Sequence, residues 1–409
     1  MTRCRLCQAP LLMRLVDLGR SPLANSYLSA EALEQPEASY PLCPMVCENC
    51  WLVQLPAFET PEAIFNEYLY FSSFSDSWLD HCRVLTESLT QRLGLGGASR
   101  VIEVASNDGY LLQFFQQAGI PVLGIEPAAN VAAVAQAKNI PTEVRFMGAQ
   151  LGSELAAQGN QANLVLGLNV LAHVPDLHDF TEGLRLSLAP EGTLVMEFPH
   201  VLELIRGLQF DTIYHEHFSY LSLLPVERLF REHGLALFDV ETLNTHGGSL
   251  RIFACHAQDD RAGKPAEGLR RARQGEALAR LDDRGGYAEF ADKILNIRER
   301  LLKHLHKARA NGRKVVGYGA PAKGVTLLNY CGIGPDLLPY TVDRSLWKQG
   351  KFLPGCHIPI RCPTDLIADR PDEVLILPWN LEAEIRSQMV EIKAWGGRFV
   401  VPIPTLRVH

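Results

Sequence analysis

The sequence predicts an α/β protein in which a small cysteine-rich module precedes two Rossmann-like halves. Three observations predict this fold class. Cysteines and prolines crowd residues 1–66, short apolar strands alternate with helical segments over residues 67–258, and a second strand, glycine turn and helix begin within residues 259–409. Strands that alternate with helices are typical of parallel, doubly wound sheets. We therefore expect three domains with these three ranges.

The composition fits several globular domains and argues against nucleic acid as the main partner. A chain of 409 residues exceeds one ordinary core, and 47% apolar with 21% charged residues is a usual globular composition. The formal net charge of −7 is unlike the basic surface that nucleic acid demands. An anionic small ligand stays possible, because backbone amides at helix N-termini bind phosphate. We expect a monomer.

Neither a membrane span nor a secretory leader is expected. No apolar run approaches the length of a membrane span, and residues 1–8 hold two cysteines without an apolar core. Ten cysteines without an export signal indicate thiols or metal ligands rather than a disulfide framework. We therefore expect a cytoplasmic protein.

The N-terminal module is turn-rich, with little helical periodicity before residues 61–68. It contains two CxxC pairs: Cys4, Cys7, Cys47 and Cys50. Each pair can place two thiolates on one tetrahedral ion, and zinc binding would supply folding free energy that the small core lacks. The gap between the pairs exceeds that of the commonest zinc ribbons, so four unrelated thiols are the alternative. Cys43 is a possible substitute ligand.

The central part begins with a predicted helix and continues as alternating strands and helices. Residues 76–93 carry apolar side chains at helical spacing. The following strands are expected at 100–104, 122–125, 163–168 and 193–197, with helices at 111–118 and 130–138. Residues 235–243 and 249–256 could close the sheet as an antiparallel pair.

The first strand leads into a tight loop with the sequence VIEVASNDG, which suits a nucleoside ligand. Glu103 ends the strand, and Asn107 and Gly109 tolerate positive φ, so the backbone can approach a ligand closely. Glu126, after the next strand, can accept hydrogen bonds from ribose hydroxyls. Ala105 and Asn107 stand where glycines are usual in the E-x-G-x-G-x-G loop of SAM-dependent methyltransferases, and a nicotinamide dehydrogenase competes with that interpretation.

Two later segments concentrate residues that can carry chemistry. Residues 169–175 (NVLAHVP) resemble the methyltransferase segment that closes over the methionine part of SAM, although His173 could be an ordinary histidine at the start of a helix. Residues 210–221 (FDTIYHEHFSYL) place His215, Glu216 and His217 among aromatic side chains. Such a cluster can supply a general base and hold an oxyanion, while a polar loop with aromatic anchors is the alternative.

The C-terminal part starts with polar helical sequence over residues 259–310 and continues as a second α/β unit. Its strands are expected at 314–318, 340–342, 373–377 and 399–401, with a helix at 326–330. The string VVGYGAPAKG has a strand, a glycine turn and a helix start, which is a phosphate-cradling geometry. Lys323 could add a charge against a diphosphate. A tight turn that needs glycine for packing alone is the alternative.

The order of these motifs resembles the nucleotide-sugar C-methyltransferases that methylate C-3 of dTDP-4-keto-deoxysugars. The resemblance spans nearly the whole chain through strings at residues 4–25, 47–55, 68–73, 103–112, 169–175, 211–218, 246–251, 317–334 and 377–380. It implies a class I methyltransferase domain in the centre, SAM as cofactor, a structural Zn²⁺ ion and a nucleotide-diphosphate sugar as substrate.

The resemblance also implies roles for individual residues. A base removes the C-3 proton beside the C-4 ketone, and the resulting enediolate attacks the methyl group of SAM. The family's proposed base falls on His217, its Y-x-E-H string adds Tyr214 and Glu216, and Tyr70 is a candidate to stabilise the enediolate. His173 is a further catalytic candidate. The cofactor candidates are Glu103, Ala105, Asn107, Gly109, Glu126 and Asn169, and the substrate candidates are Asn169, His173, Gly319, Lys323 and Asn329.

Two other classes of function compete with this one. A zinc-dependent or nicotinamide-dependent oxidoreductase acting on a nucleotide sugar could use two Rossmann-like halves, but the first loop lacks GxGxxG and all four CxxC cysteines share one structural-looking module. A non-catalytic nucleotide-sugar-binding relative is the other possibility. The string formed by Tyr214, Glu216 and His217 argues against it.

Overall fold

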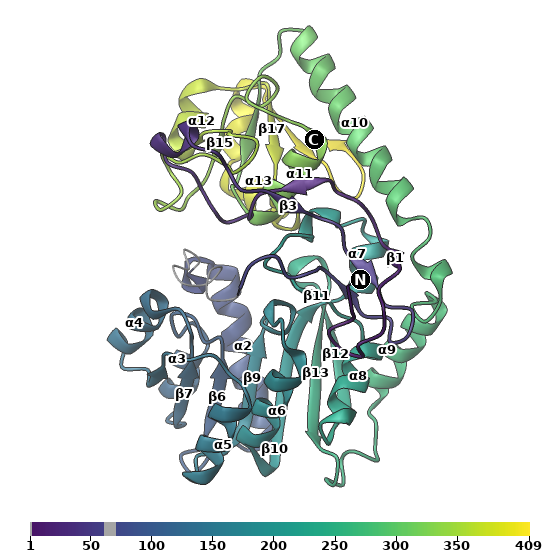
Figure 1. Cartoon of the computed structure of the whole chain (residues 1–409). Helices are drawn as coiled ribbons and strands as arrows, with labels where there is room; N and C mark the ends of the chain where they lie inside the picture. The colour runs from purple at the N-terminus through teal and green to yellow at the C-terminus, as the bar shows by residue number, and fades with distance from the viewer. Residues whose placement is uncertain (1, 61–70) are drawn as a thin grey trace. The chain divides into compact units, whose positions relative to one another are not determined.

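The computed structural model describes residues 2–60 and 71–409, which form two compact units (Figure 1). Each unit is assembled from segments that are not consecutive in the chain. The first unit contains Met1–Leu11, Cys47–His200 and Phe218–Asp282. The second contains Leu12–Val46, Val201–His217 and Asp283–His409. The three domain ranges expected from the sequence stay a prediction.

The first unit is built on a seven-stranded sheet with the order β12-β13-β10-β9-β6-β7-β8. Its strands are β6 (Val101–Val104), β7 (Val122–Ile125), β8 (Thr142–Glu143), β9 (Ala162–Leu168), β10 (Leu188–Pro199), β12 (Leu235–Leu243) and β13 (Ser249–His256). The strands from β6 to β10 pair in parallel, and β12 and β13 close one edge as an antiparallel pair.

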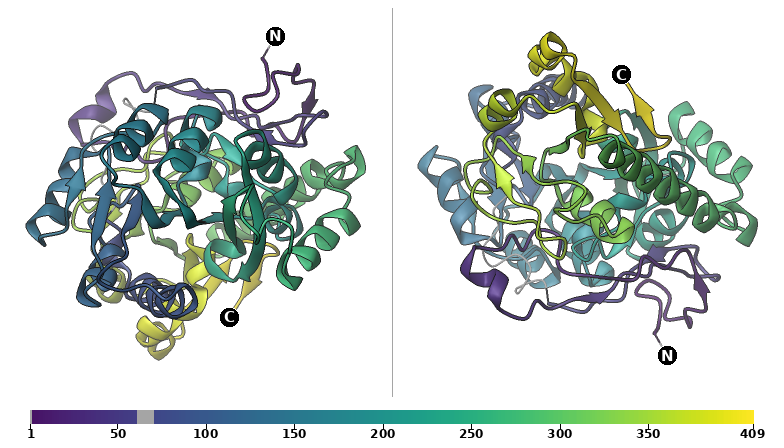
Figure 2. Two further views of the ribbon diagram at one scale, coloured as in Figure 1. Left: turned by 90° about the horizontal axis from the view of Figure 1, so that it is seen from below. Right: turned by 90° about the horizontal axis from the view of Figure 1, so that it is seen from above.

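Helices lie on both faces of this sheet (Figure 2). They are α2 (Asp76–Leu93), α3 (Leu112–Gln117), α4 (Ala129–Ala137), α5 (Ala149–Ala157), α6 (Leu177–Ser187), α8 (Leu223–Glu232) and α9 (Glu267–Leu278). Leu85 and Leu89 of α2 pack with Phe115 of α3 against Leu164 and Leu166 of β9 in one hydrophobic core. The Ser75 side chain caps the start of α2, and Gly94 ends it with a φ of 62°. Short pieces complete the unit: β5 (Val53–Gln54), η2 (Ser72–Phe74), η3 (Leu171–His173), β11 (Ser219–Tyr220) and η5 (Thr245–Gly247).

The second unit has a six-stranded sheet with the order β16-β15-β14-β17-β18-β19. Its strands are β14 (Val315–Tyr318), β15 (Thr341–Val342), β16 (Ile360–Arg361), β17 (Glu373–Ile376), β18 (Arg398–Val401) and β19 (Arg407–Val408). Numbered along the chain, this is the 3-2-1-4-5-6 order of the Rossmann fold, in which ligands bind beyond the carboxyl ends of the strands where the order reverses. That point lies between β14 and β17.

Helices and short N-terminal strands complete the second unit. The helices are η1 (Glu31–Glu34), α7 (Val201–Arg206), η4 (Phe210–Thr212), η6 (Arg284–Gly286), α10 (Phe290–Ala310), α11 (Ala322–Cys331), α12 (Pro363–Asp369), η7 (Trp379–Leu381), α13 (Glu382–Gln388) and η8 (Val390–Trp395). Two small antiparallel pairs come from the N-terminal segment: β1 (Met13–Arg14) with β4 (Met45–Val46), and β2 (Arg20–Ser21) with β3 (Tyr40–Pro41).

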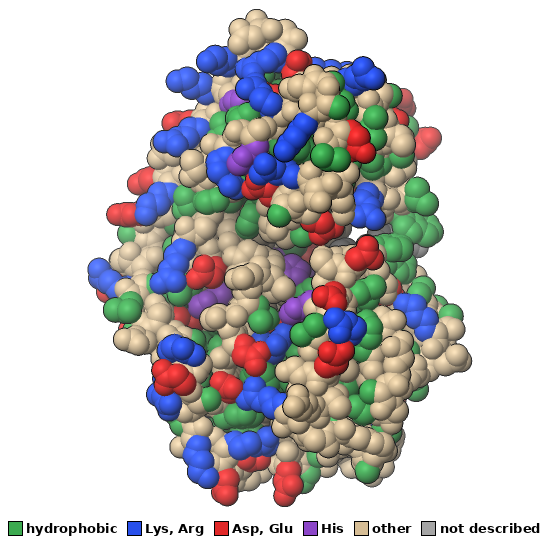
Figure 3. All heavy atoms as spheres, turned by 180° about the vertical axis from the view of Figure 1, so that it is seen from behind, with side chains coloured by type: hydrophobic (Ala, Val, Ile, Leu, Met, Phe, Trp, Pro, Cys, Tyr) green, Lys and Arg blue, Asp and Glu red, His purple; other side chains and the backbone are tan. Residues whose placement is uncertain are grey.

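The predicted α/β class is confirmed, and several predicted elements have the observed bounds. The helix at 76–93, the strand at 122–125 and the antiparallel pair agree to the residue. The polar stretch before residue 310 forms two helices, and the first of these, α9, packs on β12 in the first unit. Among the described residues, no helix combines the length and apolarity needed to cross a membrane. Basic and acidic side chains are interspersed over the face shown in Figure 3.

Candidate functional site

The four CxxC cysteines converge in the first unit. Their sulfur atoms all lie within 4.8 Å of one another, and the Sγ atoms of Cys4 and Cys50, like those of Cys7 and Cys47, are 3.5 Å apart. A tetrahedral zinc with Zn–S bonds of about 2.3 Å places its sulfurs about 3.8 Å apart. The cluster therefore fits one zinc ion. Cys43 belongs to the second unit and is not part of it.

The backbone around both pairs repeats the same turn. The residue after each pair, Gln8 or Trp51, has a positive φ of 58° or 61° and donates its N–H to the carbonyl of the first cysteine. Gln54 also donates to the Cys4 sulfur at 3.1 Å. These turns aim both sulfurs of a pair inward, as a structural zinc site requires.

The loop after β6 holds left-handed backbone at three alternate residues. Ala105, Asn107 and Gly109 have φ values of 56°, 49° and 77°. These are the three glycine positions of the E-x-G-x-G-x-G pattern, so the two departures in sequence keep the backbone path that glycine usually provides. A Cβ atom on Gly109 would lie 2.3 Å from Cδ1 of Ile140, so an alanine here would push the end of that side chain aside.

Glu103 lies fully buried at the end of β6. Neither of its carboxylate oxygens has a hydrogen-bond partner among the described residues. Burial raises the pKa of Glu103 well above its usual value, and the nearby Tyr110 hydroxyl offsets only part of that effect. A buried carboxyl that lacks a full set of donors suits a ligand that brings its own, such as the ammonium group of SAM.

Glu126 and Asn107 tie the loop together. The carboxylate of Glu126 accepts hydrogen bonds from the N–H groups of Asn107 at 2.9 Å and Ala128 at 2.8 Å. Burial raises the pKa of Glu126, and these two amides counter the increase. The side chain of Asn107 accepts a hydrogen bond from the N–H of Ser72 at 2.9 Å, which attaches η2 to the loop. Tyr70, the second tyrosine of the string YLYFSS at residues 68–73, lies outside the described residues.

Asn169 and His173 follow β9 on the neighbouring loop. Asn169 has a φ of 56°, and its side-chain oxygen is buried and accepts no hydrogen bond from the described residues. His173 ends η3 and is partly exposed. Phe218, the residue after His217, donates its N–H to the carbonyl of Ala172 at 2.8 Å. This bond ties Phe218 to η3 within the first unit.

His217 has a defined tautomer in the second unit. Its Nδ1 atom lies 2.9 Å from the carbonyl oxygen of Thr212, and its ring packs on Tyr214 with a centroid separation of 4.0 Å. A carbonyl oxygen can only accept, so Nδ1 carries the proton and Nε2 is the basic nitrogen. This geometry is what a general base requires.

The other two ionisable groups of the string are buried. His215 approaches the carbonyl of Pro41 at 3.2 Å and packs edge-on against Tyr40, and burial lowers its pKa. Glu216 accepts hydrogen bonds from the backbone and side-chain nitrogens of Asn25, and burial raises its pKa. Asn25 was not predicted as a site residue, although it ends the first family-like string.

The second glycine turn uses its own amides to build the fold. The N–H of Gly319 donates to the carbonyl of Val342, and that of Ala320 donates to the Asp343 carboxylate, each at 2.7 Å. Gly319 has a φ of 87°, and a Cβ there would lie 2.5 Å from Pro378. Close packing against the end of β17 therefore requires this glycine.

Lys323 lies in a cluster of polar and aromatic residues after that turn. Its Nζ donates to the Asn380 side chain at 2.6 Å and lies 5.0 Å from the ring centre of Trp379. Trp379 donates its indole N–H to Asp211 at 2.7 Å. Burial lowers the pKa of Lys323, against the effect of the Asp211 charge, and burial raises that of Asp211 to about 6.

Asn329 contacts the chain at residues 354–355. Its side-chain nitrogen donates to the carbonyls of Val325 at 2.9 Å and Pro354 at 3.0 Å, and a Cβ on Gly355 would collide with its oxygen. Asp211, Trp379 and Asn380 were not predicted as site residues, although all three lie in family-like strings.

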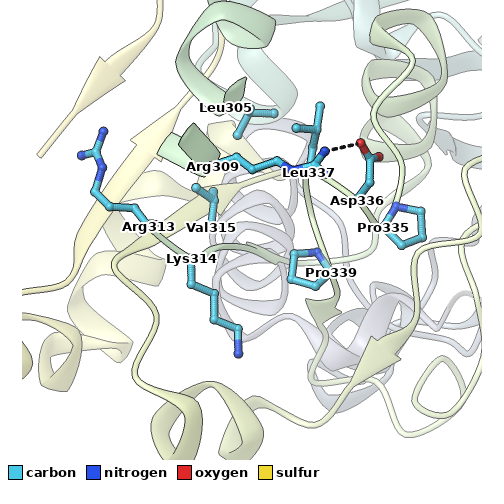
Figure 4. A pocket seen from close by; sticks show the side chains of 9 residues that line it. All are labelled: Leu305, Arg309, Arg313, Lys314, Val315, Pro335, Asp336, Leu337 and Pro339. Atoms are coloured by element: carbon cyan, nitrogen blue, oxygen red, sulfur yellow. Dashed lines mark hydrogen bonds and ion pairs between the residues drawn. The ribbon is translucent and has the colours of Figure 1, made fainter. Parts of the chain in front are cut away.

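One shallow pocket of the second unit lies away from these residues (Figure 4). It has a volume of about 160 Å³ and includes Lys314 and Val315 at the amino end of β14. Its cations are paired, Arg309 with Asp336, Arg313 with Glu373 and Lys314 with Asp369. Ligands of Rossmann-like sheets bind at the opposite edge, so this pocket is not the candidate site.

Comparisons with known proteins cover the whole chain. Residues 4–65 match a family model described as "Putative zinc binding domain", residues 78–240 one described as "Methyltransferase domain", and residues 244–404 one described as "C-methyltransferase C-terminal domain". The C-methyltransferase NovU of Streptomyces niveus is 40% identical over 410 residues, which cover 99% of this chain and 96% of that protein.

Solved structures resemble less of the chain. Magnesium protoporphyrin IX methyltransferase of Synechocystis PCC 6803, with bound SAH, is 18% identical, with 44% of this chain and 83% of that chain covered and a TM-score of 0.35. The PH0226 protein of Pyrococcus horikoshii OT3 is 14% identical, with 49% and 100% covered and a TM-score of 0.36. At such TM-scores these likenesses say nothing about the activity of this chain.

Proposed function

The chain belongs to the SAM-dependent C-methyltransferases, and from this premise we propose that it methylates a carbon, C-3 in the first instance, of a nucleotide-linked 4-keto-deoxysugar. The observation that carries the proposal is the geometry of His217. The Thr212 carbonyl holds the proton on Nδ1, so Nε2 is the atom that takes a proton. Family membership disfavours the oxidoreductase alternative.

SAM supplies an electrophilic methyl group on a sulfonium. The left-handed loop at residues 105–109 suits the cofactor because it follows β6 at the carboxyl end of the strand, where the ligands of such sheets bind. Glu126 is the candidate partner of the ribose hydroxyls, and Glu103 that of the ammonium group. Asn169, whose side-chain oxygen accepts no hydrogen bond from the described residues, is the candidate for the methionine end.

The reaction needs a base and a group that steadies the oxyanion. His217 Nε2 would take the proton next to the ketone, the carbanion electrons would form the new carbon–carbon bond, and the cofactor would leave as S-adenosylhomocysteine. Hydrogen bonds to the enediolate oxygen should matter as much as the base, because a proton beside a ketone is only weakly acidic. Tyr70, Tyr214, Glu216 and His173 are the candidates for those bonds.

The nucleotide diphosphate is expected at the carboxyl edge of the second sheet. The strand order reverses between β14 and β17, and Gly319 and Lys323 follow β14 at that point. The ammonium group of Lys323 has three donors, and one of them goes to Asn380. Asn329, which fixes residues 354–355, would support this edge. We also propose that the nucleotide is dTDP and that the protein is a monomer.

Solvent exchange tests the proposed reaction directly. The protein would be incubated in D₂O with a panel of dTDP-4-keto-6-deoxysugars, with and without SAM, and the sugars read by mass spectrometry. One deuteron gained by one sugar without SAM, and one methyl group gained with SAM, are expected. If SAM binds and no sugar changes mass, the acceptor belongs to another chemical class.

A single substitution separates the enzyme from a non-catalytic binder. His217→Asn retains a side chain that can donate to the Thr212 carbonyl but removes the basic nitrogen, so exchange and methyl transfer should both fall by about 10²–10⁴-fold. SAM affinity, measured by calorimetry, should hold. A wild-type protein that binds the sugar and exchanges no proton would be a binder.

A further inference from the structure

Helix α11 presents three residues on one face to residues 210–213, a short segment that precedes His217 in the chain. Lys323, Thr326 and Tyr330 are spaced three and four residues apart, which aligns side chains along one side of a helix. The segment they approach is η4 with the residue that follows it. All of these residues belong to the second unit.

Each of the three residues makes a different contact. The ring of Tyr330 packs against that of buried Phe210 with a centroid separation of 5.2 Å. The hydroxyl of Thr326 donates to the carbonyl of Ile213 at 2.9 Å, and both groups are buried. Lys323 acts on the Asp211 carboxyl through its charge, which lowers the pKa of that carboxyl against the effect of burial.

The chain after β17 adds a fourth contact. It comes from the strand that lies beside β14 at the point where the strand order reverses. Trp379 donates its indole N–H to the carboxylate of Asp211 at 2.7 Å. Asn380 accepts a hydrogen bond from Lys323. Asp211 is therefore held by a directed hydrogen bond and by a nearby cation, and it is fully buried.

The residue fixed by this network is Thr212, which lies between the anchored residues Asp211 and Ile213. Its carbonyl accepts the hydrogen bond that sets the tautomer and ring orientation of His217. A displacement of this carbonyl would turn the imidazole and its basic nitrogen. Misplacing a catalytic group by about 1 Å costs on the order of 10²-fold in rate.

We propose that Asp211, Trp379 and Thr326 are positioning residues that aim His217 by locking the Thr212 carbonyl between α11 and the end of β17. This inference rests on the proposed function, because it takes His217 as the base. It gives residues 317–334 and 377–380 a role beyond substrate binding, because they hold the segment that orients the base.

Trp379→Phe is the sharpest test, because it removes the indole donor and retains an aromatic ring. Thr326→Val removes only the hydroxyl and serves as the second, milder variant. Each should slow proton exchange without SAM, and kcat for methyl transfer, by the same factor, about tenfold to a hundredfold. The KM for the dTDP-4-keto-6-deoxysugar that exchanges, and the SAM affinity, should change less than about twofold, since an altered aim lowers kcat alone.

Trp395→Phe is the matched control. Trp395 also donates its indole N–H, in its case to the backbone carbonyl of Pro371 at 3.0 Å, and it lies in the same unit. A structural role alone would make the Trp379 and Trp395 variants lose thermal stability and activity alike. Only the Trp379 variant should slow the exchange of the sugar proton.

A double substitution decides whether Trp379 acts through His217. In the His217→Asn background, Trp379→Phe should cause no further loss of methyl transfer, because the group it aims is gone. A further tenfold loss, or unchanged exchange in both the Trp379 and Thr326 variants, would overturn the inference. If His217→Asn itself leaves exchange intact, the base assignment fails instead, and the two failures are thereby told apart.

Discussion

Ala105 is strained where the family's glycine is missing. Ala105→Gly should relieve a left-handed conformation worth about 1–2 kcal/mol, while the freer unfolded chain costs about 0.4–1 kcal/mol. We therefore expect a gain of roughly 0.5–1 kcal/mol in the free energy of unfolding, measured by urea denaturation with and without SAM.

The control for this substitution is Ala133→Gly on the exposed side of α4, which should lose about 1 kcal/mol because glycine is a poor helix former. Asn107→Gly should also lose stability, since it removes the acceptor for the Ser72 N–H. A loss for Ala105→Gly as large as that of the control would show that this backbone is not left-handed.

Asp211 should make stability depend on pH in a predictable direction. Burial raises its pKa in the folded chain to about 6, so the folded state binds the proton more tightly than the unfolded state. Stability is then greatest below the unfolded pKa and falls as the pH rises through about 6. Relative to Asp211→Asn, the wild-type chain should lose about 2 kcal/mol between pH 4.5 and 7.

Denaturant titrations of both chains at the two pH values measure this difference, and contributions from other titrating groups cancel in the comparison. A wild-type stability that rises relative to the variant over the same range would mean that Lys323 and Trp379 stabilise the carboxylate more than burial penalises it. The pKa would then lie below its usual value.

At the scale of elements, the zinc turns are the parts whose chemistry could be predicted from spacing alone. One zinc ion per chain is expected by elemental mass spectrometry. Cys50→Ala should abolish stoichiometric zinc, because three thiolates leave the tetrahedron incomplete. Cys43→Ala should retain one zinc, since Cys43 lies outside the cluster. Equal loss of zinc in both variants would contradict the four-cysteine assignment.

Periodicity predicted the elements that face water on one side and a core on the other. The helix at 76–93 alternates buried and exposed residues over five turns, so it was found with its bounds. The pair β12–β13 was found for another reason, because two long strands are joined by a short turn, although every residue of β13 is buried. The sequence could not show that the N-terminal module contributes to both units. Its middle segment packs elsewhere through contacts that no local pattern encodes.

The candidate site was predictable to the extent that each motif is continuous in sequence. The left-handed φ values at Ala105 and Asn107 follow from their register with the glycine pattern. The network around Asp211 could not be predicted in this way, because its partners lie more than one hundred residues away in the chain. None of these side chains is of a type that signals such a contact in the sequence. Only the fold brings such residues together.

At the scale of the whole molecule, the two units should respond to different ligands. SAM at one hundred times its dissociation constant stabilises the state that binds it by about 2.7 kcal/mol. Hydrogen exchange should therefore slow in peptides covering residues 101–109, 122–131 and 166–173 of the first unit. The peptide covering β14 and α11 should respond instead to dTDP.

Two glycines of the first unit supply the control for this experiment. Gly109 and Gly159 both have positive φ, so alanine is strained at either position, but only a Cβ on Gly109 collides with a neighbour, Cδ1 of Ile140. Gly109→Ala should weaken the protection by SAM, because the Ile140 side chain beside the loop must shift, whereas Gly159→Ala should retain it. Equal SAM-dependent protection of α11 and of the loop after β6 would mean that SAM binding affects both units. The proposal that the two sheets bind different ligands would then be wrong.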